Sequence, residues 1–220
     1  MDTTPSFDIA ASDATEKLLE CDIVLLPDTT LAEQSLLFSA AAADKGTFFT
    51  LTKQTCVPHL SLYMTQIAVA DAPAVLRQLQ IIASHAALVP LEAVRYNQAF
   101  GYFDAAYTRP PALSQLQAQV VAAVNPLRRG IRPGEAEFLP TASGLKRQNI
   151  EQFGYRGVGE LFRPHLTLTR FTDQRPIATD GLPPIADFSG TFNRLALYET
   201  GEHGTCIREL GAFPLSGEPR

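Results

Sequence analysis

Two short stretches of the chain alternate leucine with polar residues at the two-residue period of a β-strand. Residues 58–62 read PHLSL and residues 164–168 read PHLTL. Because residues i and i+2 of a strand share a face, each histidine points the same way as the hydroxyl residue two positions later. The leucines point to the other face, into a core. The pattern therefore predicts two strands, each of which presents an imidazole beside a hydroxyl group.

The rest of the hydrophobic pattern predicts further strands and helices. Strands or extended segments are expected over 22–27, 47–52, 57–69, 161–171, 188–199 and 205–213, with two more inside 88–107 that turn near Gly101. Helices are expected from Leu31 to Gly46, from Asp71 onward, from Pro110 to Pro126 and over 143–153. Residues 130–142 and 172–187 are typical of loops. Since a helix precedes each pentapeptide strand, the order predicts an α+β fold with two pseudo-symmetric lobes, whose mostly antiparallel sheets are flanked by helices and enclose a cleft.

The composition favours one domain over residues 1–220, with residues 1–20 as a variable lead-in. Hydrophobic residues make up 45% of the 220 residues and charged residues 19%, which suffices for an ordinary core. No run is long and apolar enough to span a bilayer, and the acidic N-terminus lacks the residue order of a signal peptide. Three cysteines without a Cys-x-x-Cys pair are typical of a reducing compartment. These features predict a cytoplasmic location.

Charge is unevenly distributed along the chain. The net charge is −5, and residues 1–50 carry two basic and nine acidic residues. Residues 127–175, which include the second pentapeptide, carry nine basic and five acidic residues. A protein that follows a long nucleic acid usually has a continuous basic surface. The local positive excess instead suits one or two phosphates, so we expect a small phosphoester or short oligonucleotide substrate, no strong binding to long RNA and no membrane partner.

Two histidines on opposite sides of a cleft suit phosphodiester chemistry. Histidine gives or takes a proton near neutral pH more readily than other side chains. In an in-line displacement at phosphorus the attacking and leaving oxygens lie opposite each other, so one imidazole can act as the base and the other as the acid. The hydroxyls of Ser61 and Thr167 can donate hydrogen bonds to the nonbridging oxygens. The residues alone leave open which of His59 and His165 is the base.

The two His-x-Ser/Thr-x tetrads resemble those of the 2H phosphoesterase superfamily, which includes 2′-5′ RNA ligase-like proteins and cyclic nucleotide phosphodiesterases. Residues 163–170, RPHLTLTR, are similar to the second motif of that family, and residues 57–63, VPHLSLY, are similar to the first. The resemblance implies a single domain of two α+β lobes about a pseudo-twofold axis. It places the four polar motif side chains in the cleft between the lobes.

The predicted catalytic residues are His59 and His165, and the predicted phosphate-binding residues are Ser61 and Thr167. No metal and no other cofactor is expected, because zinc sites need three or four ligands and only Cys56 lies near the first motif in the sequence.

Other residues are candidates for substrate contact. Tyr63, two positions after Ser61, shares the predicted cleft face and can contact phosphate, stack on a base or simply pack. Arg170 shares no face with the motif residues, so it is either structural or a cation at the cleft edge. Weaker candidates are Lys53, Phe103, Tyr155 and Arg163. His85 on a helix and His203 in a turn are expected to be exposed and inert.

The leading hypothesis is a metal-independent phosphodiesterase that hydrolyses a 2′,3′-cyclic nucleotide-like ester or a 2′-5′ linkage. A second hypothesis is an RNA 2′-5′ ligase-like transferase, which runs the reverse of the same step. A third, from a different class, is a non-catalytic module that binds a nucleotide or phosphonate. We expect a monomer.

Overall fold

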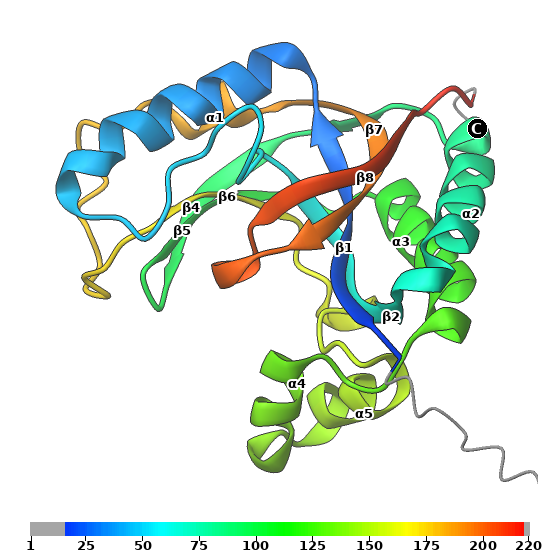
Figure 1. Cartoon of the computed structure of the whole chain (residues 1–220). Coiled ribbons are helices and arrows are strands. Elements are labelled where there is room, and N and C mark those ends of the chain that lie inside the picture. The colour runs from blue at the N-terminus through cyan, green and yellow to red at the C-terminus, as the bar shows by residue number, and fades with distance from the viewer. Residues whose placement is uncertain (1–15, 218–220) are drawn as a thin grey trace, which may run out of the picture.

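Two antiparallel β-sheets organise residues 16–217, the part of the chain that the computed structural model describes (Figure 1). The strands are β1 (Leu18–Pro27), β2 (Leu60–Ala68), β3 (Val89–Leu91), β4 (Ala93–Ala99), β5 (Tyr102–Tyr107), β6 (His165–Arg170), β7 (Gly190–Thr200) and β8 (Cys206–Pro214). The five-stranded sheet has the order β2-β1-β7-β3, with β8 also paired to β7, and the three-stranded sheet has the order β4-β5-β6. The predicted α+β class with antiparallel sheets is confirmed, and the two lobes differ in size.

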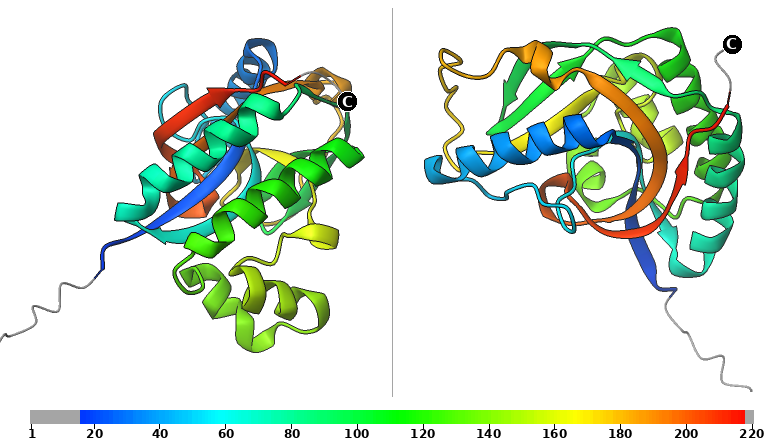
Figure 2. Two further views of the ribbon diagram at one scale, coloured as in Figure 1. Left: turned by 90° about the vertical axis from the view of Figure 1, so that its right-hand side faces the viewer. Right: turned by 90° about the horizontal axis from the view of Figure 1, so that it is seen from above.

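Helices cover the outer faces of both sheets. Their bounds are α1 (Thr29–Ala42), α2 (Ala72–His85), α3 (Pro111–Val124), α4 (Pro133–Phe138) and α5 (Gly144–Phe153). Helices α2 and α3 pack on the five-stranded sheet, and α1 lies across the three-stranded sheet (Figures 1 and 2). Helices α4 and α5 lie together, away from both layers (Figure 1).

Most predicted elements are present, and their ends have local causes. Asp28 caps α1, because its side chain accepts a hydrogen bond from the Leu31 amide at 2.9 Å. The predicted extended segment 47–52 is mostly irregular, with one isolated bridge from Thr47 to Phe171. The predicted loop over 130–142 is wrong, because it contains α4. Proline is accepted in the first turn of a helix, so the Pro-Gly pair at the start of α4 does not prevent it.

Of the predicted lead-in over residues 1–20, the structure describes only residues 16–20. Residues 1–15 of the expected lead-in lie outside the described part of the chain, and residues 18–20 belong to β1 rather than to a loose segment. Among residues 16–217, none of the helices has the length and hydrophobicity that a membrane span requires.

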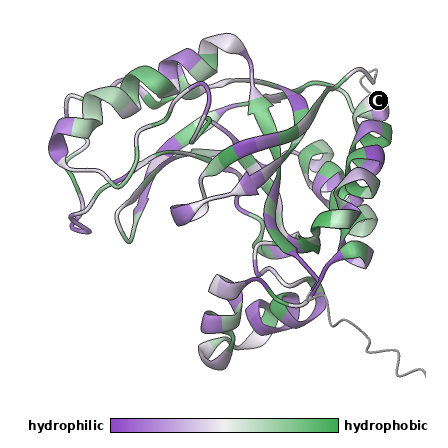
Figure 3. Ribbon diagram, in the orientation of Figure 1, coloured by the Kyte–Doolittle hydropathy of each residue, from purple (hydrophilic) through white to green (hydrophobic). Residues whose placement is uncertain are grey.

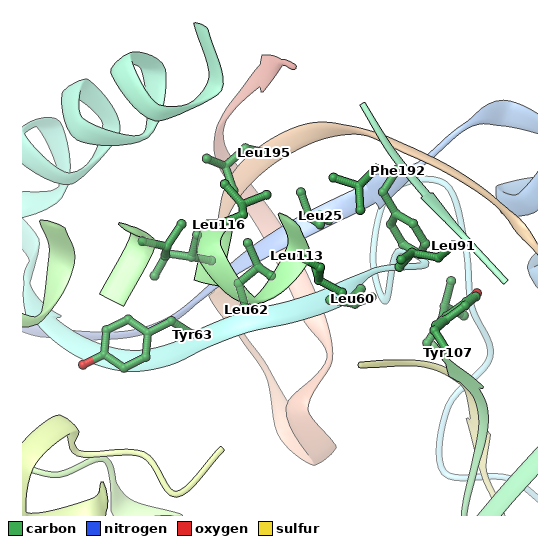
Figure 4. Close-up of a cluster of buried hydrophobic side chains, with 14 of the residues drawn as sticks. Leu25, Leu60, Leu62, Tyr63, Leu91, Tyr107, Leu113, Leu116, Phe192 and Leu195 are labelled. Atoms are coloured by element: carbon green, nitrogen blue, oxygen red, sulfur yellow. The ribbon is translucent and has the colours of Figure 1, made fainter. Parts of the chain in front are cut away.

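The leucines of both pentapeptides are buried, as predicted. Leu60 and Leu62 are fully buried with Leu113 and Leu116 of α3 in the cluster drawn in Figure 4. Leu166 and Leu168 are fully buried on the other sheet, beneath α1. Hydrophobic residues also run along most of β1, which lies between β2 and β7 in the five-stranded sheet (Figure 3). With the leucines anchored in the core, the polar residues of β2 and β6 are left for the opposite faces.

Candidate active site

A single cleft of about 430 Å³ brings the two pentapeptide strands together. His59 and Ser61 line it from the five-stranded sheet, and His165 and Thr167 line it from the three-stranded sheet. These residues are 106 positions apart in each pair, so only the tertiary fold joins them. As predicted, the polar side chains of the two motifs lie in one cleft.

Each motif strand has a β-bulge directly after the hydroxyl residue. On β2, Ser61 and Tyr63 pair with consecutive residues of β1, so Leu62 is the extra residue. On β6, Thr167 and Thr169 pair with consecutive residues of β5, so Leu168 is the extra residue. A bulge shifts the two-residue alternation by one position. Beyond each bulge, therefore, the residues that face the cleft are not those expected from regular alternation.

The bulge on β2 overturns the prediction for Tyr63. Its side chain is fully buried, and its hydroxyl donates to the carbonyl oxygen of Phe153 at 2.6 Å. Figure 4 shows Tyr63 at the edge of the buried cluster. Met64, the next residue, lines the cleft instead. Of the roles that the sequence left open for Tyr63, the structure therefore supports packing.

The bulge on β6 brings Arg170 to the rim of the cleft. Arg170 Nη1 lies 2.7 Å from His203 Nδ1, and its guanidinium lies over the rings of Tyr102 and Phe48 at 4.6 and 5.0 Å. Tyr102 and His203 both line the cleft. Arg170 is thus a cation at the cleft edge. His203, expected to be exposed and inert, is partly buried and lines the cleft from the turn between β7 and β8.

The side chain of Arg163 does not line the cleft. It is exposed, and its Nη1 donates to the backbone oxygens of Glu160 and Phe162 at 2.5 and 3.0 Å. The backbone carbonyl of Arg163 has a different use, because it accepts a hydrogen bond from His165 Nδ1. Arg163 therefore contributes to the site through its main chain.

The weaker candidates are divided among three places. Tyr155 lines the cleft. Phe103 is buried, stacked on Phe38 of α1 at 5.4 Å. Lys53 lies 3.8 Å from Glu33 and away from the cleft, and His85 is exposed, as expected.

Both catalytic candidates are held in the same tautomer. His59 Nδ1 lies 2.7 Å from the carbonyl oxygen of Val57, and His165 Nδ1 lies 2.7 Å from that of Arg163. A carbonyl oxygen only accepts, so each Nδ1 carries the hydrogen and each Nε2 has a free lone pair in the neutral ring. The arrangement leaves both Nε2 atoms for proton transfer, and that of His59 lies 3.9 Å from Asp22 Oδ2.

Two carboxyl groups behind the hydroxyls were not predicted. Ser61 Oγ donates to Asp22 Oδ2 at 2.5 Å, and Thr167 Oγ1 donates to Asp104 Oδ1 at 2.8 Å. Asp22 lies on β1 and Asp104 on β5, each on the strand next to its motif. The available signal was an acidic residue with an apolar residue on each side of it in the sequence. Each carboxyl group orients its hydroxyl, so the same hydroxyl–carboxyl pair is present in both lobes.

The first motif is the more buried of the two, and its ionisable groups are shifted accordingly. Burial raises the pKa of Asp22 to about 7, against the opposing effect of the hydrogen bond from Ser61. Burial also lowers the pKa of His59 to about 4, and the charge of His165 adds to this. Asp22 Oδ1 is buried and has no hydrogen-bond partner within residues 16–217. His59 is therefore neutral at pH 7, and its Nε2 can accept a proton.

One group of side chains in the described part of the chain has a metal-like arrangement. Potential ligand atoms of Asp22, His59 and Cys206 lie within 4.8 Å of one another. Cys206, rather than the Cys56 considered from the sequence, is the cysteine near the motif. Burial raises the pKa of Cys206 well above its ordinary value, which disfavours the thiolate that zinc binds. Metal independence stays a prediction, tested below.

The chain was compared with known families and structures. A family model described as "Protein of unknown function (DUF1045)" matches residues 49–182. No curated protein sequence matches the chain.

Several solved structures share the fold. A structure of E. coli LigT complexed with phosphate is 15% identical, covers 91% of this chain and 99% of its own, and gives a TM-score of 0.54. TT0787 of Thermus thermophilus is 18% identical, with coverage of 91% and 100% and a TM-score of 0.56. A structure described only as a phosphoesterase is 15% identical, with coverage of 90% and 99% and a TM-score of 0.53. At such identities the likeness establishes the fold.

Proposed function

Because the chain belongs to the DUF1045 family and has the fold of the 2H phosphoesterases, we propose that it is a metal-independent phosphodiesterase. Its substrate is a cyclic phosphodiester of the 2′,3′-cyclic nucleotide kind or a 2′-5′ linkage. The observation that carries the proposal is the pair of imidazoles, His59 and His165, which line one cleft with Nδ1 bound to main-chain oxygen and Nε2 free.

We assign the role of base to His59 and the role of acid to His165. His59 is neutral at pH 7 because burial lowers its pKa, so its Nε2 takes a proton from water. The water oxygen forms a bond to phosphorus as the bond to the leaving oxygen breaks on the opposite side. Protonated His165 gives its Nε2 proton to the leaving oxygen. His59 ends protonated and His165 neutral, and exchange with solvent restores the starting state.

The two hydroxyls support the phosphate through their carboxyl partners. While Asp22 is ionised, the hydrogen of Ser61 points to it rather than to the substrate. When Asp22 carries a proton, it can donate to Ser61 Oγ, and the hydroxyl hydrogen is free for a nonbridging oxygen. The raised pKa of Asp22 makes this protonated form accessible near neutral pH. Thr167 and Asp104 are the corresponding pair in the other lobe.

Incubation with 2′,3′-cyclic mononucleotides, followed by chromatography, tests the proposal. We expect one monophosphate isomer as the product, because a single leaving oxygen faces the acid. Joining of RNA ends without hydrolysis would favour the ligase-like alternative. Binding without any turnover would favour the non-catalytic module.

Loss of either hydroxyl should be a mild defect. We expect Ser61→Ala and Thr167→Ala each to lower kcat/KM by roughly fivefold to tenfold, the usual net value of one hydrogen bond. The proton-transfer pair stays intact in both variants. Ser84→Ala, which removes an exposed hydroxyl on α2, is the matched control. A folded alanine variant as inactive as a histidine variant would mean that the hydroxyl is a nucleophile.

Long RNA should bind weakly. The chain has a net charge of −5, and the positive excess is confined to residues 127–175. A gel-shift titration with structured and single-stranded RNA at physiological salt, run beside hydrolysis of cyclic mononucleotides, measures both properties. Tight RNA binding with a steep salt dependence, and no turnover of small esters, would contradict a small substrate.

A further inference from the structure

One wall of the cleft comes from the α4–α5 segment, which lies apart from both sheets (Figure 1). Arg132, at the N-terminus of α4, lines this wall together with Glu135. Tyr155 and Arg156, just after α5, complete it. The proposed mechanism uses none of these four residues, so the charged groups of this wall need another explanation.

Arg132 has hydrogen-bond donors that the protein does not satisfy. Its side chain is 13% exposed, and Nε is buried without a hydrogen-bond partner within residues 16–217. Nη2 reaches Glu20 at 3.5 Å, the limit of a hydrogen bond, and Nη1 contacts the sulfur of Met64 at 3.7 Å. The contact to Glu20 is a long ion pair, and a thioether sulfur is a weak acceptor, so most donors of the guanidinium have no close oxygen partner. A buried guanidinium left in this state is costly unless a ligand supplies acceptors.

Arg156 is positioned beside it by packing rather than by hydrogen bonds. Its guanidinium lies over the ring of Phe138 at 4.1 Å, and its Nε is 3.3 Å from Glu135 Oε1. The side chain is 41% exposed, and the Nη groups donate no hydrogen bond to protein atoms of the described residues. The stacked guanidinium is therefore fixed in place with its fork of donors still available.

Glu135 does not neutralise this wall completely. Its side chain is 3% exposed, its Oε2 is buried without a partner in the described chain, and burial raises its pKa. Glu20, the other acidic neighbour, is 38% exposed and touches Arg132 only at the distance limit. Arg132 and Arg156 each have one carboxyl partner, Glu20 and Glu135, and neither partner occupies all the donors of its guanidinium, so the wall has an excess of hydrogen-bond donors.

We propose that Arg132 and Arg156 bind a second phosphate of the substrate, separate from the phosphodiester that the histidines attack. The inference rests on the proposed function and narrows it to phosphodiesters that carry an additional phosphate monoester. Planar guanidinium forks match the oxygens of a phosphate, and a monoester carries more charge than a diester. The cleft of about 430 Å³ is large enough for a nucleotide that spans both parts.

A matched pair of substrates tests the inference. Adenosine 2′,3′-cyclic phosphate and its 5′-phosphorylated form differ only in the second phosphate. We expect the wild-type protein to prefer the 5′-phosphorylated form by about tenfold or more in kcat/KM, the value of one charge-assisted hydrogen bond or more. Arg132→Gln and Arg156→Gln should each remove most of the preference, and Arg156→Lys should keep part of it.

The controls separate the subsite from general charge and from folding. Arg147→Gln removes the same charge from an exposed ion pair on α5 and should leave the preference unchanged. If Arg156→Gln does not fold because Glu135 loses its partner, the double variant with Glu135→Gln replaces it. Equal kcat/KM for both substrates in the wild-type protein, or an equal preference in all variants, would overturn the inference.

A binding experiment keeps the inference testable if neither ester is hydrolysed. Calorimetry on the His59→Ala variant compares adenosine 3′,5′-bisphosphate with adenosine 3′-monophosphate. We expect the bisphosphate to bind about tenfold tighter or better, and Arg156→Gln to abolish the difference. Equal affinity would refute the subsite. Absence of hydrolysis together with a bisphosphate preference would refute only the proposed catalytic function.

Discussion

His59→Ala and His165→Ala should each lower kcat for a 2′,3′-cyclic nucleotide by about 10²- to 10⁴-fold, the usual contribution of a positioned acid or base. Each Nδ1 is held by a main-chain oxygen at 2.7 Å, which fixes the orientation of each imidazole in the cleft. The two effects should be far from additive, because the base and the acid act in the same step. Steady-state kinetics of both single variants and the double variant measure this.

His85→Ala is the control, because this histidine is exposed on α2. EDTA should leave the activity of the wild-type protein unchanged. A strong loss in EDTA that zinc or manganese restores would contradict the proposed mechanism and would point to the group of Asp22, His59 and Cys206. In that case Cys206→Ser should abolish the metal response.

The fold class and the centre of the site could be predicted because each pentapeptide is locally self-consistent. Leu60 and Leu166 must be buried, and this fixes where His59 and His165 point once the segments are strands. Capping and proline signals are equally local. The Asp28 cap of α1 is an example, because one side chain and one amide decide it.

The faces beyond the motifs could not be predicted, because a β-bulge depends on the partner strand. Leu62 and Leu168 are the extra residues, and nothing in either pentapeptide indicates that its strand is bulged. The alternation of a regular strand places Tyr63 on the cleft face and Arg170 on the opposite face of its strand. The bulges reverse both, so Tyr63 is buried and Arg170 reaches the rim.

Other residues of the site escaped prediction because they come from distant segments. His203 lies in the turn between β7 and β8, and only the pairing of those strands brings the turn over the cleft. Arg132 and Glu135 lie in a stretch whose proline and glycine are typical of a loop. Asp22 is one of two acidic residues in the largely apolar β1, and its importance depends on the register between β1 and β2.

The raised pKa of Asp22 links the stability and the activity of the protein to pH. Its side chain is fully buried, so the neutral carboxyl is favoured in the folded state relative to the unfolded chain. Because the pKa of Asp22 is higher in the folded state than in the unfolded chain, this residue contributes stability that is fully present below its unfolded-state pKa of 3.8. That stability is lost as the pH rises from there through the folded-state pKa of about 7. Asparagine is the neutral isostere of the protonated carboxyl, and its side chain does not ionise over this range.

Asp22→Asn should therefore become more stable than the wild-type protein as pH rises from 4 to 8, with a difference on the order of a few kcal/mol above pH 7. Urea titrations at several pH values measure the difference in the free energy of unfolding. Asp44→Asn, which changes an exposed carboxylate, is the control and should stay within about 0.5 kcal/mol of wild type.

The side-chain amide of the Asp22→Asn variant can also donate to Ser61 Oγ and leave the hydroxyl hydrogen for phosphate. Activity of this variant should accordingly decline less above pH 7 than that of the wild-type protein. A variant that is destabilised equally at every pH, or that loses activity at pH 6, would mean that Asp22 acts in its ionised form.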